Sequence, residues 1–134
     1  MISNKEYAAR RAELMSLMHS NSIAVISSAP EKIRSRDTHY PYKQNVNLSY
    51  LCGFPEPEAV LVLIPGREQG EMVLFCRDKD PLRETWDGYR EGPEGAVQNF
   101  AADDAFPIAD IDDILPNLIE GKDRLYYAIG KDPE

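Results

Sequence analysis

The sequence contains few of the residue types that build metal centres and disulfides. Its 134 residues include two cysteines, Cys52 and Cys76, and two histidines, His19 and His39. Neither cysteine lies in a CxxC motif, so we expect two reduced, buried thiols rather than a disulfide. A catalytic zinc or two-metal site collects several His, Asp and Glu side chains. Two histidines so far apart in the sequence therefore argue against a complete metal site in this chain.

Motifs for nucleophilic catalysis and phosphate binding are also missing. No serine lies in a Gly-x-Ser-x-Gly motif, and no cysteine has a histidine near it in the sequence. Gly88, Gly92 and Gly95 lack the strand–turn–helix context of a phosphate-binding loop. The sequence therefore does not favour an independent small enzyme.

Long apolar runs and positive charge are scarce as well. The longest apolar run, Ala59–Ile64, is far shorter than the roughly 20 residues of a membrane-spanning helix. The first residues contain no apolar segment of the kind found in secretory signals. Fifteen Lys and Arg oppose 23 Asp and Glu, and the net charge of −8 repels nucleic acid and anionic lipid. We therefore expect a cytoplasmic protein with no nucleic-acid and no membrane partner.

The patterns that are present predict one α/β domain. Apolar residues make up 43% of the chain and charged residues 28%, the balance of a globular protein. Ser3 and Glu6 form a capping box that opens a predicted helix over 4–19. The β-branched run over 23–27 is typical of a strand covered on both faces. A helix followed by a buried strand indicates layered α/β construction.

Further elements follow along the chain. The patterns predict a half-buried strand over 47–52, strands over 58–64 and 70–76, a short helix over 94–101, an amphipathic helix over 111–119 and a last strand over 124–129. The link between the second and third strands is too short for a parallel return, so they should pair antiparallel. Asp110 and Asp113 should cap the amphipathic helix, and Gly121 should close it.

Two polar segments, 28–45 and 77–95, are predicted to be long loops. They carry Tyr40, Tyr42 and Trp86 together with several arginines. Such side chains anchor recognition surfaces because each combines a large contact area with a polar tip. The alternative is that the three aromatic side chains pack inward and only hold the loops in place.

These loops and the strands beside them carry a family resemblance. The motifs are Arg34–Asp37, Tyr40–Asn45, Tyr50–Ile64, Val73–Phe75 and Trp86–Arg90. Together they resemble the N-terminal domain of bacterial Xaa-Pro aminopeptidases (aminopeptidase P), and the match covers nearly the whole chain. The resemblance assigns residues 1–134 to that single domain. It implies an α/β fold in which a mixed β-sheet of ribonuclease H-like type is flanked by helices.

The resemblance also implies where the chemistry resides. Members of the family join this domain to a C-terminal "pita-bread" catalytic domain. There, Asp, His and Glu ligands bind two metal ions, commonly manganese, and the enzyme removes the N-terminal residue that precedes proline. None of those ligand positions occurs in this chain. The chain also stops at 130–134, directly after a predicted strand, so we expect a truncated N-terminal domain that is inactive by itself.

Two residues of this chain are implied to bind substrate, Asp37 and Trp86. In the family the N-terminal domain helps to build a homo-oligomer, a dimer or tetramer, and screens the mouth of the active site. Trp86 corresponds to a tryptophan near the substrate groove, and Asp37 to an aspartate that approaches a groove of a neighbouring subunit. The implied partners are the chain's own catalytic domain, further subunits and a proline-containing peptide. No catalytic residue or metal ligand is implied within the chain.

A second reading of the sequence stays open at this point. The chain could be a stand-alone, non-catalytic peptide-binding or scaffold module with the same fold. The coding sequence beyond residue 134 separates the two readings: a stop codon favours the module, and a few hundred further residues with metal ligands favour the enzyme.

Overall fold

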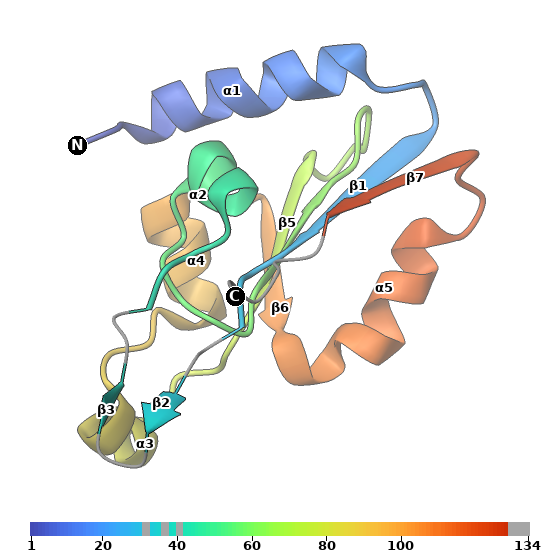
Figure 1. Ribbon diagram of the computed structural model, residues 1–134. Coiled ribbons are helices and arrows are strands. Elements are labelled where there is room, and N and C mark those ends of the chain that lie inside the picture. Colours follow the sequence, from blue (N-terminus) through green and yellow to red (C-terminus); the bar gives the residue numbers. More distant parts are fainter. Residues whose placement is uncertain (31–32, 36–37, 40–41, 129–134) are drawn as a thin grey trace.

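The computed structural model describes residues 1–30, 33–35, 38–39 and 42–128; for 33–35 and 38–39 it describes the backbone alone. In chain order the elements are α1 (Asn4–Leu17), β1 (Ser22–Ser27), β2 (Ile33–Ser35), β3 (Thr38–His39), α2 (Val46–Cys52), β4 (Val60–Leu63), β5 (Met72–Cys76), α3 (Pro81–Asp87), α4 (Gly92–Phe100), β6 (Asp104–Pro107), the 3-10 turn η1 (Ile108–Asp110), α5 (Ile111–Ile119) and β7 (Arg124–Ala128). Figure 1 shows their arrangement in space.

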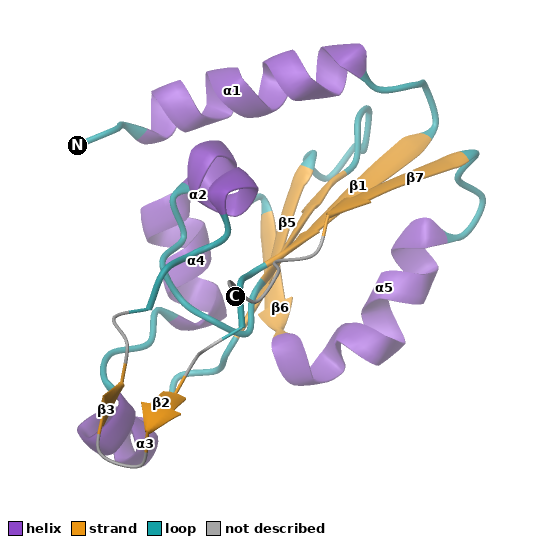
Figure 2. Cartoon of the chain, viewed as in Figure 1, coloured by secondary structure: helices purple, strands orange, loops and turns teal. Residues whose placement is uncertain are grey.

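Five strands form one mixed sheet in the order β6-β5-β4-β1-β7 (Figure 2). β4 pairs antiparallel with β1 and with β5, whereas β7 runs parallel to β1 and β6 runs parallel to β5. In register, Val25 of β1 lies opposite Val62 of β4 and Tyr127 of β7. The predicted antiparallel pairing of β4 with β5 is confirmed, and so is a mixed sheet flanked by helices.

Helices cover the central strands of the sheet on both faces, which explains why these strands are almost wholly apolar. Alternate residues of β1 show the two faces. Ala24 and Ile26 lie on the face that α1, α2 and α4 cover, whereas Ile23 and Val25 lie on the face that α5 covers (Figure 1). We call these the α1 face and the α5 face. Each face has its own apolar cluster, so the fold has three layers.

The prediction of a strand over 47–52 was wrong, because these residues form helix α2. Leu48, Leu51 and Cys52 are buried, and their i, i+3, i+4 spacing is helical. The side chain of Asn45 caps the helix by accepting hydrogen bonds from two backbone N–H groups. Gly53 ends it with a left-handed φ of 72°. The alternation of polar and apolar residues over 47–52 thus belongs to a helix that buries one face.

The two predicted loops contain regular structure, which is a second correction. β2 and β3 pair antiparallel within 28–45, and α3 lies within 77–95. Asp80 caps α3 by accepting the N–H of Arg83, and Pro81 occupies the first turn. α3 has no apolar period because none of its residues is buried. Strand β6, which lies on the edge of the sheet, was not predicted.

The helix caps are confirmed in part. Ser3 accepts the N–H of Glu6 at 3.2 Å, but the Glu6 carboxylate accepts from Arg10 instead of returning to the cap. Asp110 occupies the N-cap of α5 without a side-chain hydrogen bond, and Gly121 follows the helix as expected.

Both cysteines are reduced and buried, as the sequence predicted. Burial raises the pKa of Cys52 to about 11 and that of Cys76 to about 12, so both thiols stay protonated and unreactive at neutral pH. Among the residues described here, no helix is long and apolar enough to cross a membrane.

Candidate functional site

The segment from Arg77 to Glu91, which we call the α3 excursion, leaves the sheet after β5. It ends where α4, which covers one face of the sheet, begins. The apolar side chains of the excursion point to solvent: Leu82 is 76% exposed, Trp86 83% and Tyr89 66%. In Figure 1, α3 projects from the same end of the molecule as β2 and β3. The alternative in which Trp86 packs inward is therefore wrong. An exposed indole is available to contact another molecule.

One buried carboxylate closes the base of the α3 excursion. Glu56, which lies in the turn after α2, is 7% exposed. Its Oε1 accepts from Nη2 of Arg77 at 3.3 Å, and its Oε2 accepts from the backbone N–H of Glu91 at 2.7 Å. Arg77 and Glu91 are the first and last residues of the excursion. Glu56 therefore holds both ends of the segment at one point.

Glu56 also connects the excursion to the first polar loop. The side-chain amide of Gln44 donates to the backbone oxygens of Phe54 and Glu56, at 3.0 and 2.8 Å. Its oxygen accepts from the N–H of Ala29 and from the hydroxyl of Tyr42. Residues 42–45 and the turn after α2 therefore pack against each other, although the two motifs to which they belong were singled out separately in the sequence.

The structure tests the inward-packing alternative for Tyr42 but not for Tyr40. Tyr42 is half-buried, and its hydroxyl donates to the backbone oxygen of Ala29 at 2.6 Å. The inward-packing alternative is thus right for Tyr42. Tyr40 and Asp37 lie outside the described residues. The structure therefore places Trp86 on the surface and leaves the predicted role of Asp37 untested.

An ion pair joins the two arms of the α3 excursion close to its base. Nζ of Lys79 lies 2.8 Å from Oε1 of Glu84, 2.7 Å from the backbone oxygen of Arg90 and 4.1 Å from the centre of the Tyr89 ring. The hydrogen bond with Lys79, followed by the backbone N–H of Arg90, lowers the pKa of Glu84 to about 2. The same hydrogen bond raises the pKa of Lys79. Both groups are charged at neutral pH.

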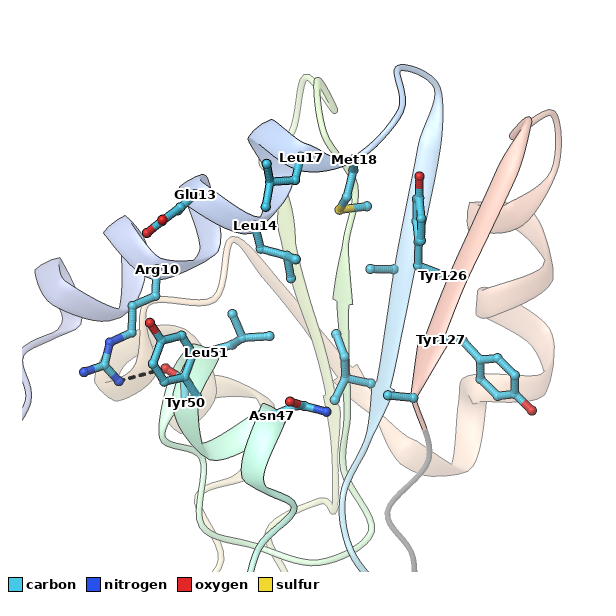
Figure 3. A pocket seen from close by; sticks show the side chains of 13 residues that line it. Arg10, Glu13, Leu14, Leu17, Met18, Asn47, Tyr50, Leu51, Tyr126 and Tyr127 are labelled. Carbon is cyan, nitrogen blue, oxygen red and sulfur yellow. Dashed lines mark hydrogen bonds between the residues drawn. The ribbon is translucent and has the colours of Figure 1, made fainter.

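A cavity of about 570 Å³ lies on the α1 face, beside the sheet edge at β7 (Figure 3). Its walls are mainly apolar. The lining residues are Arg10, Glu13, Leu14, Leu17, Met18, Ala24, Ile26, Asn47, Tyr50, Leu51, Tyr126, Tyr127 and Ala128. None of the aromatic residues of the α3 excursion lines it, so the cavity and Trp86 are separate features.

Two arginines of α1 fix one wall of this cavity. Arg10 donates to the backbone oxygen of Tyr50 at 3.1 Å and stacks over the Tyr50 ring at 4.3 Å (Figure 3). Arg11 donates to the backbone oxygen of Leu51 at 2.9 Å. These are carbonyl groups in the last turn of α2, where cations are favoured. Sequence reasoning missed this cavity because it predicted a strand in place of α2.

The carboxylates of the described residues are dispersed. In the part of the chain that the structure describes, no three His, Cys, Asp or Glu side chains lie together as metal ligands. Many acidic groups instead hold backbone N–H groups or pair with arginine and lysine, as Glu56 and Glu84 do. The described residues thus do not fit a two-metal centre.

Residues 7–126 match the family described as the N-terminal domain of aminopeptidase P. The chain belongs to this family.

Known proteins are similar to this chain in both sequence and structure. Xaa-Pro aminopeptidase of Escherichia coli is 41% identical over 131 residues, and human Xaa-Pro aminopeptidase 3 is 35% identical over 138. The alignments cover 97% and 94% of this chain. The solved structure of Pseudomonas aeruginosa aminopeptidase PepP is 60% identical, superposes with a TM-score of 0.93 and covers 98% of the chain. The fold expected from the resemblance is therefore confirmed.

The match concerns one part of each relative. This chain spans 30% of the E. coli protein, 27% of the human protein and 30% of the P. aeruginosa chain.

Proposed function

We propose that the full-length protein carrying this chain is a Xaa-Pro aminopeptidase, a hydrolase that removes the N-terminal residue preceding proline. The observation that carries this proposal is the 60% identity and TM-score of 0.93 with P. aeruginosa aminopeptidase PepP. Relatives from bacteria and animals bear the name Xaa-Pro aminopeptidase, which supports the same activity. The location that we propose is the cytoplasm.

The catalytic machinery would lie outside this chain, in a C-terminal pita-bread domain that binds two manganese ions. A zinc-substituted form of E. coli aminopeptidase P has been solved in complex with product, which supports a metal requirement in the family. Metal ions held by that domain would supply Lewis-acid activation of water and of the scissile carbonyl. The residues of this chain would contribute to access and assembly.

We assign that contribution to Trp86 and Asp37. An indole that is 83% exposed on a projecting segment can form one wall of a groove. A carboxylate at the rim would attract the cationic N-terminus of a short peptide. The domain would also contribute to a homo-oligomer, a dimer or tetramer, in which Asp37 approaches a neighbouring subunit. The acidic net charge of −8 suits a cationic peptide N-terminus.

Peptidase assays test the proposal. With manganese present, the full-length protein should release arginine from an Arg-Pro-Pro peptide and leave a matched Arg-Ala-Pro peptide intact. The 134-residue chain with excess manganese should release nothing. Turnover by the 134-residue chain would contradict its non-catalytic role. If the coding sequence stopped at residue 134, the stand-alone module would replace the enzyme.

A further inference from the structure

Helix α3 of the excursion is folded although it buries no apolar face. Helix α3 has seven residues and none of them is buried. A helix of this length is unstable in water by itself, and most helical stability in proteins comes from packing of an apolar face. Leu82, Trp86 and Tyr89 face solvent, so they do not provide that packing. Something other than apolar burial must hold the helix.

Glu84 contacts both ends of α3. Its Oε2 accepts the backbone N–H of Asp80, the N-cap residue, at 3.1 Å. Its Oε1 accepts the backbone N–H of Arg90, which lies beyond the C-terminal Gly88, at 2.9 Å. The same oxygen accepts from Nζ of Lys79 at 2.8 Å. One carboxylate therefore joins the residues before, within and after the helix that carries Trp86.

Neighbouring contacts also join the segment before α3 to the segment after it. Lys79 also donates to the backbone oxygen of Arg90, and Arg90 Nη1 lies 3.4 Å from the backbone oxygen of Asp78. The side chain of Glu84 is 13% exposed, so its hydrogen bonds are partly shielded from water. Charge-assisted hydrogen bonds of this kind are the stronger ones in proteins. Its depressed pKa, about 2, agrees with a carboxylate that is held in its charged form.

We propose that Glu84 is the positioning residue of Trp86: by binding the backbone on both sides of α3, it fixes the direction in which the indole projects. This proposal rests on the function proposed above for Trp86 at the substrate groove. Glu84 itself points to backbone and Lys79, so it acts on a peptide substrate through Trp86 alone.

The variant Glu84→Ala distinguishes the proposed role of Glu84 from the effect of helix propensity alone. Alanine has the highest intrinsic helix propensity, so propensity by itself predicts that α3 keeps or gains stability. The proposal predicts the opposite, because the substitution removes all three hydrogen bonds. Glu94→Ala is the matched control: Glu94 lies in the first turn of α4, is exposed and has no hydrogen-bond or ion-pair partner within the described part of the chain.

Trp86 supplies the readout in the 134-residue chain, where it is the only tryptophan. Time-resolved anisotropy measures how freely the indole moves. We expect the fast-decaying fraction to rise about twofold in Glu84→Ala, and the Arg90 amide to exchange its hydrogen about tenfold faster. Glu94→Ala should match the unsubstituted chain in both. Unchanged values in Glu84→Ala, or equal changes in both variants, would overturn the proposal.

A second variant and a second assay keep the outcomes distinct. If Glu84→Ala loses the far-ultraviolet circular dichroism of the folded chain, Glu84→Gln takes its place, because an amide keeps one acceptor and loses the charge. In the full-length protein, Glu84→Ala should raise KM for peptides and leave kcat unchanged. If the anisotropy changes and both Glu84→Ala and Trp86→Ala leave the peptide kinetics unaltered, the groove role of Trp86 fails while the positioning by Glu84 stands.

Discussion

The central sheet and the α3 excursion are held together by different forces. β1, β4 and β5 are buried on both faces and rely on apolar packing, as the fully buried Leu61 and Phe75 show. The excursion buries no residue of α3 and relies on the carboxylates of Glu56 and Glu84. Carboxylates hold a segment through its backbone, so its aromatic side chains stay outside. The comparison explains how one small domain can be stable and still present an exposed tryptophan.

The largest effect should come from the sheet. Leu61→Ala removes a fully buried side chain on the α1 face, and we expect the free energy of unfolding to fall by about 3 kcal/mol. Urea denaturation followed by circular dichroism measures it. Leu82→Ala is the matched control on α3, where 76% exposure predicts a change within about 0.5 kcal/mol. Equal losses at both positions would show that the two regions are not held differently.

A smaller loss is expected at the base of the excursion. Glu56→Gln keeps the shape of the side chain but removes the charge that faces Arg77, and the free energy of unfolding should fall by about 2 kcal/mol. Arg77→Gln should cost a similar amount, and the double variant should cost less than the sum of the two. Strict additivity in this double-mutant cycle would contradict a direct coupling of the two groups.

Acidification should loosen the excursion before it affects the sheet. The folded-state pKa of Glu84 lies near 2, below the ordinary value of 4.5. The stabilisation that Glu84 provides is therefore complete above pH 4.5, and it is lost as the pH falls towards 2. Trp86 anisotropy should stay constant from pH 7 to 4.5 and report faster motion below. A transition centred near pH 6 would point to a different titrating group.

The smallest effect should come from the tryptophan itself. Trp86→Ala removes a side chain that is 83% exposed, so the free energy of unfolding should change by less than about 0.5 kcal/mol. Thermal unfolding of the 134-residue chain measures it. A loss as large as that of Leu61→Ala would show that the indole packs against the domain.

Sequence patterns predicted the parts of the fold that depend on apolar burial. β1, β4 and β5 were predicted because strands covered on both faces are continuously apolar. α5 was predicted because its apolar residues recur at helical spacing against the α5 face. Trp86 was singled out by residue type and by the family resemblance; the structure shows that its side chain is exposed, and its recognition role stays a prediction.

The patterns failed where polar contacts decide the structure. α3 carries the start and stop signals of a helix, Asp80-Pro81 and Gly88, but it has no apolar period to reveal it. The closing of the α3 excursion by Glu56 depends on contacts between residues 21 and 35 positions apart, which no local pattern contains. Over 47–52, six residues are too few to distinguish the alternation of a strand from the spacing of a helix.

Steady-state kinetics of the full-length protein carrying Trp86→Ala test whether the exposed indole forms part of a substrate groove. The substrates are Xaa-Pro peptides of increasing length, and the manganese content of each preparation is measured alongside. If the indole contacts substrate, the preference between short and long peptides should shift about three- to tenfold, which corresponds to the loss of one aromatic contact, with metal content unchanged. An unchanged length preference, or a loss of metal in its place, would contradict this role of the indole.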